Sequence, residues 1–189
     1  MILGSHNSWT FLPPTKWWMK LLSFISKCQE ISIGDQYDYG VRCFDLRIRF
    51  NKKRELQVAH GIVVYDISEM ILYRVLNWIN SQEEKCYVRI LHEVRNKRQR
   101  TQLSKELFIN FCSNVVERYP NITFFDGHEL SEWTYEYNFP YKPNMVERYS
   151  SVCKPFYDLP KCYAMRNNKE LKENPPECDI LLLDYVNVP

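Results

Sequence analysis

The fold is indicated most directly by the stretch Val41-Arg42-Cys43-Phe44-Asp45-Leu46-Arg47-Ile48. Residues two apart on a β-strand face the same side, so Asp45 and Arg47 share one face. The opposite face carries the apolar side chains of Phe44, Leu46 and Ile48. A buried charge is costly unless it is paired, and a structural salt bridge is the simplest interpretation of the two charges. A guanidinium near the end of a strand is also well shaped to hold a phosphate through two hydrogen bonds.

Other polar residues stand at the ends of apolar, strand-sized segments. They are His6 and Asn7 after residues 2–5, His60 and Gly61 after residues 56–59, Glu93 near the end of residues 86–94, and Asp184 after residues 179–183. A lone histidine in such a place is usually structural. Two histidines beside small residues favour a site, because one imidazole can act as base and the other as acid near neutral pH. Asp184 is read either as a loop or cap residue or as the carboxylate that orients His6.

The pattern alternates strands with helices. Strands are expected at residues 2–5, 41–48, 56–60, 86–94, 122–125 and 179–186. Helices are expected from a Thr15 cap over residues 16–28, from a capping box at residues 66–69 to about Asn80, and over residues 101–119. Residues 127–178 are expected to be irregular, with long loops and short strands or a small helix.

Strand–helix alternation implies a mostly parallel sheet covered by helices. An open doubly wound sheet fits the alternation, but polar residues at the ends of several strands favour a barrel, because barrel enzymes build their sites there. The chain has 189 residues, fewer than the ~250 typical of an eight-fold barrel. We therefore expect an α/β fold with a shortened or incomplete TIM-barrel-like (β/α) barrel, as a single catalytic domain over residues 1–189.

The composition bounds the function classes. Hydrophobic content of 45% and charged content of 25% are typical of a soluble globular protein. A net charge of +2 argues against a broad nucleic-acid-binding surface. The seven cysteines lack zinc-like spacing, and most are expected to be small buried residues; Cys153, Cys162 and Cys178 can pair in an oxidising compartment. No apolar run reaches ~20 residues and no signal peptide is visible, so a soluble protein is expected, and no obligate protein partner is inferred.

Two further features bear on a membrane surface. The basic run from Arg95 to Arg100 is either a solvated loop or an element that attracts anionic headgroups. Adjacent Trp17 and Trp18 cannot both face inward on one helix, so one is expected to be exposed. An exposed tryptophan beside a site suits an enzyme that works in peripheral contact with a membrane.

Several of these motifs resemble a known family. The segments 2–8, 36–47 and 60–61, followed by Asp184-Tyr185-Val186-Asn187, are similar to the catalytic X region of phosphatidylinositol-specific phospholipase C. The closest likeness is to the bacterial, metal-independent enzymes. It covers residues 1–95 and 179–187 and implies a distorted, open barrel.

The resemblance also implies a chemistry. His6 would act as general base on the inositol 2-hydroxyl, and His60 would protonate the departing diacylglycerol oxygen, giving a cyclic phosphodiester. Arg47 would stabilise the charge on the phosphoryl oxygens. Asp184 would support His6, and Asp45 would hold Arg47. The substrate would be a phosphatidylinositol-type lipid or another phosphodiester with an adjacent hydroxyl.

No metal or other cofactor is expected. Calcium-dependent relatives carry two carboxylates two residues apart on this strand, and here the second position is Arg47, whose fixed charge takes the place of a cation. The same substitution counts against a glycerophosphodiesterase.

The sequence also departs from the bacterial pattern. Asn7 stands where bacterial members carry aspartate, and is expected to bond to His60 or the phosphate and to lower the rate. Leu91 stands where those members carry lysine, and only Glu93, a second candidate substrate-binding residue, matches in that strand. The part that grips the inositol ring has no recognisable counterpart in residues 127–178. Trp133, Tyr135 or Tyr137 are candidates for a replacement pocket. A catalytically weak or inactive barrel that binds phosphate or lipid is therefore the alternative, followed by an interaction scaffold.

Overall fold

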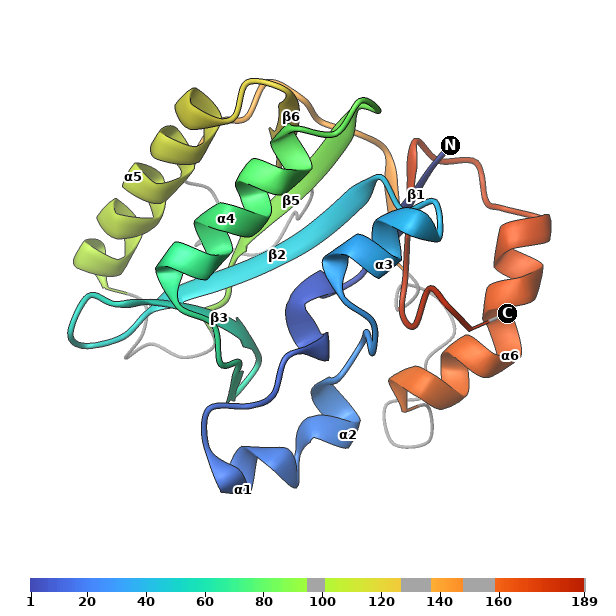
Figure 1. Cartoon of the computed structure of the whole chain (residues 1–189), viewed down its shortest axis with the longest axis horizontal. Helices are drawn as coiled ribbons and strands as arrows, with labels where there is room; N and C mark the ends of the chain where they lie inside the picture. Colours follow the sequence, from blue (N-terminus) through green and yellow to red (C-terminus); the bar gives the residue numbers. More distant parts are fainter. Residues whose placement is uncertain (95–100, 127–136, 148–158, 189) are drawn as a thin grey trace.

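The computed structural model describes residues 1–94, 101–126, 137–147 and 159–188. Its core is one curled sheet (Figure 1). The strands are β1 (Ile2–Ser5), β2 (Cys43–Phe50), β3 (Leu56–His60), β4 (Val63–Val64), β5 (Cys86–His92), β6 (Ile122–Phe125), β7 (Met145–Glu147) and β8 (Ile180–Leu183). The helices are the 3-10 turn η1 (Ser8–Phe11), α1 (Trp17–Lys20), α2 (Ser23–Ser26), α3 (Ile33–Asp38), α4 (Glu69–Asn80), α5 (Gln102–Arg118) and α6 (Pro160–Glu173).

Most of the sheet is parallel, as the strand–helix alternation predicts. The strands lie side by side in the order β6, β5, β2, β1, β8, β7, and each of these pairs is parallel. Within the described residues β6 and β7 do not pair, so the curved sheet does not close into a full barrel. The expectation of an incomplete TIM-barrel-like fold is confirmed.

One strand runs against the others. β3 pairs antiparallel with the second half of β2, and β4 pairs antiparallel with β3. Only five residues separate β2 from β3, and the left-handed Arg54 lies in that turn. A connection this short joins antiparallel neighbours, whereas a parallel pair needs a long crossover. The reversal carries the end of β3 back toward the middle of β2.

The apolar side chains of the sheet's outer face pack under two helices. Phe44, Leu46 and Ile48 of β2 are fully buried there. α4 and α5 lie across this face in Figure 1. Their inward side chains are Leu72, Leu76 and Ile79 from α4 and Phe108, Phe111 and Val115 from α5. The alternation along β2 is therefore confirmed, and Asp45 and Arg47 face the concave side.

The prediction of one continuous helix over residues 16–28 is wrong. The segment forms two separate one-turn helices, α1 and α2, and the cap of α1 is Lys16 rather than Thr15. The Thr15 hydroxyl bonds instead to Val64 O and Met19 Sδ. The apolar residues at helical spacing are largely exposed rather than buried, as the 76% exposure of Trp17 shows.

Other differences concern caps and the C-terminal third. α4 begins at Glu69 under the Ser68 hydroxyl, which accepts from Ile71 N, so Asp66 does not open it. α3, with its Ser32–Asp35 capping box, was not expected. Region 127–178 holds the 14-residue α6, a longer helix than expected. Its Pro160 at the first turn suits a helix start.

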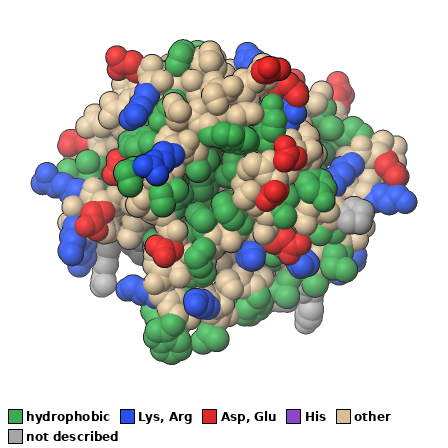
Figure 2. Space-filling view, viewed as in Figure 1, with side chains coloured by type: hydrophobic (Ala, Val, Ile, Leu, Met, Phe, Trp, Pro, Cys, Tyr) green, Lys and Arg blue, Asp and Glu red, His purple; other side chains and the backbone are tan. Residues whose placement is uncertain are grey.

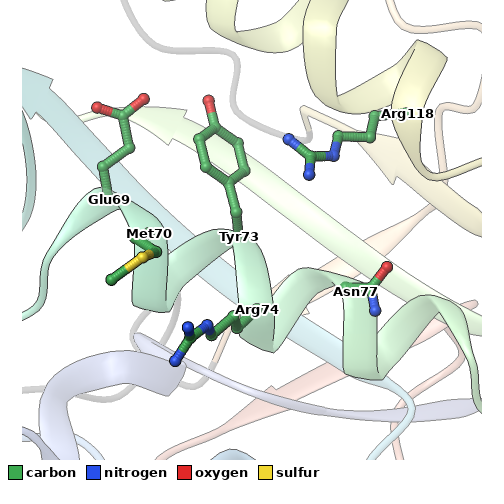
Figure 3. Close-up of a pocket in the computed structure, with 6 residues that line it drawn as sticks. All are labelled: Glu69, Met70, Tyr73, Arg74, Asn77 and Arg118. Carbon is green, nitrogen blue, oxygen red and sulfur yellow. The ribbon is translucent and has the colours of Figure 1, made fainter.

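No helix within the described ranges has both the length and the apolar character needed to cross a bilayer. The outer surface of α4 and α5 carries an open hollow away from the concave side of the sheet (Figure 3). Its lining residues are Glu69, Met70, Tyr73, Arg74, Asn77 and Arg118. It contains none of the residues that the sequence nominates for chemistry.

Gly4 allows β1 to fit between its two neighbours. A Cβ atom at this position would overlap Leu182 Cδ2 and would lie 3.1 Å from Cβ of Cys43. Both neighbouring side chains are fully buried in strands and have little room to move. The absence of a side chain at Gly4 is therefore a steric requirement of the β2–β1–β8 packing.

We expect Gly4→Ala to lower the free energy of unfolding by about 1–3 kcal/mol, the usual cost of overpacking a core. Gly34→Ala is the matched control, because its Cβ would meet only Ser32 Oγ at 3.8 Å. In helix α3 that change should be neutral or stabilising. Urea denaturation of both variants measures the difference, and equal stabilities would contradict the steric argument.

Candidate active site

The pairing of the first and last strands brings His6 and Asp184 together. β1 and β8 are parallel, with Ser5 opposite Leu183, so the next residue of each strand emerges at the same edge. His6 Nδ1 lies 2.7 Å from Asp184 Oδ1. The prediction that the last strand places Asp184 beside His6 is confirmed.

Two buried amides hold these strand ends. Gln29 Nε2 donates to the carbonyls of His6 at 3.1 Å and Leu183 at 2.8 Å. Asn168 of α6 donates through Nδ2 to the carbonyl of Asp184 at 2.9 Å. Both side chains are fully buried, so the backbone around the His6–Asp184 pair is fixed from two sides. Sequence reasoning missed both amides, because nothing local marks a buried glutamine or asparagine.

Asp45 is a fully buried carboxylate at the centre of the concave side. Its Oδ2 accepts from Arg47 Nε at 3.0 Å and from the backbone N–H of Asn7 at 3.0 Å. Burial opposes ionisation, but the positive charges of Arg47 and Arg89 outweigh it and hold the pKa of Asp45 well below its usual range. The same neighbours act on Arg47: burial disfavours its charge, yet Asp45 and Glu147 raise its pKa.

The hydrogen bonds define the tautomer of His6. A carboxylate only accepts and a guanidinium only donates. Nδ1 therefore carries the proton toward Asp184, and Nε2 accepts from Arg47 Nη2 at 2.8 Å. The Asn7 amide also donates to Nε2, at 3.2 Å. His6 is thus a neutral imidazole whose Nε2 lone pair is occupied by hydrogen bonds from Arg47 and Asn7.

His60 lies beside His6 on the reversed strand β3. The two ring centroids are 6.2 Å apart, nearly perpendicular. His60 Nδ1 lies 2.8 Å from the carbonyl of Ser26, to which it donates, so Nε2 is the nitrogen left to exchange a proton. Burial, with the positive charge of Arg47, lowers the pKa of His60 to about 4. The ring is half-buried, so solvent or substrate can reach this part of the site.

Glu93 and Asn7 lie in the cluster, with contacts partly different from those expected. Glu93 Oε1 accepts from Gly61 N at 2.8 Å, and its other oxygen is 3.8 Å from Arg47 Nη1. Asn7 donates to His6 and to Cys28 Sγ rather than to His60. Its left-handed backbone, with φ of 48°, is one that asparagine tolerates. The structure therefore brings all seven nominated residues to one place.

Two charged residues of the cluster were missed. Arg89 of β5 is fully buried and its Nη1 bonds to Glu147 Oε1, at the end of β7. Arg89 Nη1 also lies 3.7 Å from Asp45 Oδ1. Burial disfavours ionised Glu147, but the positive charges of Arg89 and Arg47 outweigh it and lower its pKa to about 2. Arg89 was detectable, because it shares a strand face with Glu93; Glu147 was not, since no periodicity marks β7.

One set of donor atoms has a spacing that suits a metal. His6, Cys28 and Asp184 each offer one atom, and these atoms lie within 4.8 Å of one another. His6 and Asp184 already bond to each other, however, and the guanidinium of Arg47 touches the same imidazole. The fixed positive charge of Arg47, 2.8 Å from His6 Nε2, opposes the binding of a metal cation to these donor atoms.

The remaining nominated features are only partly described. The basic run 95–100, Trp133, Tyr135 and Cys153 lie outside the described residues. The ring of Tyr137 packs 4.6 Å from Phe139. Cys28, Cys43, Cys86 and Cys112 are buried thiols as expected, and Cys162 and Cys178 are free.

Parallel strands that deliver polar side chains to one end of a curled sheet are the arrangement of TIM-barrel-like folds. Within that class the fold is that of bacterial phosphatidylinositol-specific phospholipase C. The enzyme from Listeria monocytogenes superimposes with a TM-score of 0.65 at 13% identity, over 97% of this chain and 87% of that one. A double mutant of the Staphylococcus aureus enzyme gives 0.66 at 16% identity, over 97% and 84%.

A further Staphylococcus aureus structure, described by its membrane binding, gives a TM-score of 0.50 at 19% identity, over 67% of this chain and 47% of that one. Neither family models nor curated protein sequences match the chain. The resemblance read from the motifs is therefore confirmed at the level of the fold.

The low pKa of His60 makes stability depend on pH. The folded value is about 4 against an ordinary 6.5, so the unfolded chain takes up a proton first and stability falls as pH drops from about 6.5 to 4. A shift of this size, discounted for the half-buried ring, is worth about 2 kcal/mol. His60→Gln should lose that part of the pH dependence.

Denaturation at pH 7 and pH 4.5 measures the effect, and NMR titration of the His60 ring gives its pKa directly. A ring that titrates near 6.5 would contradict this account.

Proposed function

We propose that this protein is a metal-independent phosphodiesterase of the phosphatidylinositol phospholipase C type, which opens its substrate by attack of an adjacent hydroxyl. The observation that carries the proposal is the pair of imidazoles 6.2 Å apart with the Arg47 guanidinium against one of them. The fold supports a phospholipase or phosphodiesterase in general terms. The residue roles are the part that we propose.

His6 serves as the general base. Its Nε2 lone pair takes the proton of the inositol 2-hydroxyl while that oxygen forms a bond to phosphorus. Asp184, 2.7 Å from Nδ1, stabilises the imidazolium that results. Arg47 turns from Nε2 to a phosphoryl oxygen as the substrate enters, which frees the base and places a cation where negative charge grows. Asp45 keeps Arg47 in position for this exchange.

His60 serves as the general acid. The bond from phosphorus to the diacylglycerol oxygen breaks as His60 gives that oxygen a proton, leaving a cyclic phosphodiester. Burial and Arg47 keep its pKa near 4 in the ligand-free state. A bound phosphate anion raises this pKa, because an opposite charge nearby favours the imidazolium. Substrate binding therefore prepares the acid, and Glu93 holds the turn at Gly61 that presents it.

Arg47 supports independence from metals. Its guanidinium fills the position at which a cation would neutralise the phosphate and provides that charge itself. The fixed positive charge beside His6 opposes occupation of the His6–Cys28–Asp184 donor set. Chelators should therefore leave turnover intact.

An apolar surface next to the site supports action at a lipid surface. It consists of the exposed side chains of α1 and α2 and the residues between them: Trp17, Trp18, Leu21, Phe24 and Ile25. Figure 2 shows hydrophobic side chains gathered at this end of the molecule. Ser26, directly after Ile25, accepts the hydrogen bond from His60. The α1–α2 surface thus connects directly to the proposed acid, and basic Lys16, Lys20 and Lys27 flank it.

We expect the wild-type chain to release diacylglycerol from phosphatidylinositol vesicles in the presence of a chelator. His6→Ala and His60→Ala should each lower kcat by about 10²–10⁴-fold, the usual contribution of general acid–base groups. Phosphorus NMR of the water-soluble product should show a cyclic diester before any open monoester. Arg42→Gln, which breaks an exposed pair with Glu84, is the control for a lost charge far from the site.

Turnover that vanishes with chelator and returns with a divalent cation would contradict the metal-independent mechanism. Saturable vesicle binding by the wild type without any product would support instead the alternative, a lipid-binding barrel in which Asn7 replaces a catalytic carboxylate.

We expect Trp17→Ala combined with Phe24→Ala to weaken binding to phosphatidylinositol vesicles by about tenfold or more, since two exposed apolar side chains are lost. Hydrolysis of a monomeric, water-soluble inositol phosphodiester should not change. Met165→Ala, at an equally exposed position on α6, is the matched control. Vesicle sedimentation measures binding. If the double variant lost as much activity on the soluble substrate as it lost in vesicle binding, the substitutions would have damaged the active site rather than membrane docking.

A further inference from the structure

Arg89 is a buried cation with spare hydrogen-bonding capacity. Its side chain is fully buried, and Nε and Nη2 have no hydrogen-bond partner among the described residues. Within the described part of the chain, Nη1 alone is engaged, by the carboxylate of Glu147, with Asp45 Oδ1 at 3.7 Å. A guanidinium presents its donors in a fork that suits two oxygens of an anion. The free Nε and Nη2 donors of Arg89 suggest a ligand that offers more acceptor oxygens than the Glu147 carboxylate does.

Glu147 lies where such an anion would bind. One carboxylate oxygen contacts Arg89 Nη1 and lies 4.0 Å from Arg47 Nη2, and the other oxygen lies 4.0 Å from His6 Nε2. The carboxylate thus sits between the two arginines and the proposed base, where the phosphoryl group of a substrate would have to be. It is also partly accessible, since its side chain is 15% exposed whereas that of Asp45 is fully buried.

The charge balance shows that the carboxylate and a second anion compete. Two guanidiniums face three carboxylates within 4.0 Å, those of Asp45, Glu93 and Glu147, so these groups together carry a charge of −1. Addition of a phosphate monoanion would make the charge −2. Exchange of Glu147 for the phosphate leaves it at −1. The exchange needs only side-chain rotation of Glu147, because its backbone stays paired with β8 opposite Leu182.

We propose that Glu147 is a built-in phosphate mimic, which holds the anion site between Arg47 and Arg89 in the ligand-free protein and must swing out for a phosphate group to bind. The inference rests on the proposed function only for the identity of the natural ligand, since anion exchange requires no turnover. Glu147 then sets the affinity that an anion needs in order to bind. An anion that binds the arginines weakly does not displace the Glu147 carboxylate, whereas an anion that makes additional contacts with the protein does. Arg89 becomes a second phosphate-binding residue beside Arg47.

The test measures binding of inorganic phosphate by isothermal titration calorimetry on the full chain. Glu147→Gln removes the competing charge and should tighten phosphate binding by about tenfold relative to wild type. Glu147→Asp keeps the charge but withdraws it by one methylene, and should give a smaller gain in a protein that retains its buried ion pairs. Glu84→Gln is the control, because it removes one negative charge from an exposed carboxylate that pairs with Arg42. This variant should bind phosphate as wild type does.

A double variant locates the site. Arg89→Met with Glu147→Gln removes the buried pair together, so no buried charge is left without a partner, and the gain from Glu147→Gln should disappear. Phosphate should also raise the Tm of Glu147→Gln more than that of wild type.

The proposal is overturned if Glu147→Gln or Glu147→Asp, folded by circular dichroism, binds phosphate no more tightly than wild type; Glu147 is then only a structural partner of Arg89. Tighter phosphate binding without lipid turnover by wild type would uphold this inference while the proposed function fails. Lipid turnover by wild type, together with phosphate binding that does not change in the Glu147 variants, would uphold the proposed function while this inference fails.

Discussion

The site depends on keeping the carboxylate of Asp45 charged inside the protein. A fully buried carboxylate is stable only with opposite charge and donors around it. Arg47, Arg89 and the backbone N–H of Asn7 provide them from three elements. Each partner is thereby fixed: Arg47 is aimed at His6, Arg89 at Glu147, and the chain after β1 turns where Asn7 reaches Asp45. One buried charge therefore arranges the groups that surround a phosphate in the proposed mechanism.

The sheet's geometry carries the histidines to these charges. β1 occupies only the first part of the β2 edge, at Cys43 and Phe44, and β3 occupies the last part, from Ile48. The gap between them is filled by residues 7–8, and Ser8 Oγ accepts the otherwise unpaired N–H of Asp45. His6 at the end of β1 and His60 at the end of the reversed β3 approach this gap from opposite directions. Antiparallel pairing of β3 is thus what makes the two imidazoles neighbours.

Much of this could be read from the sequence. Alternating burial on β2, the positions of His6 and Asp184 at strand ends, and a shortened parallel barrel all follow from side-chain period and the position of polar residues. The failures have physical causes. Residues 16–28 have helical spacing, but Trp17, Leu21, Phe24 and Ile25 stay exposed, and two short helices replace the single helix. β7 has three residues and no alternation, which left Glu147 invisible, and Gln29 acts through carbonyls that no motif encodes.

The sequence by itself determined which residues can share a face and which strands can be buried, because those depend on spacing along one segment. It thus identified His6, Asp45, Arg47, His60 and Asp184 as a set. Only the tertiary structure decided their protonation and their partners. The neutral tautomer of His6, the low pKa of His60 and the occupation of the arginine pair by Glu147 arise from groups up to 178 residues apart, and charge interactions of this kind depend on distance in space.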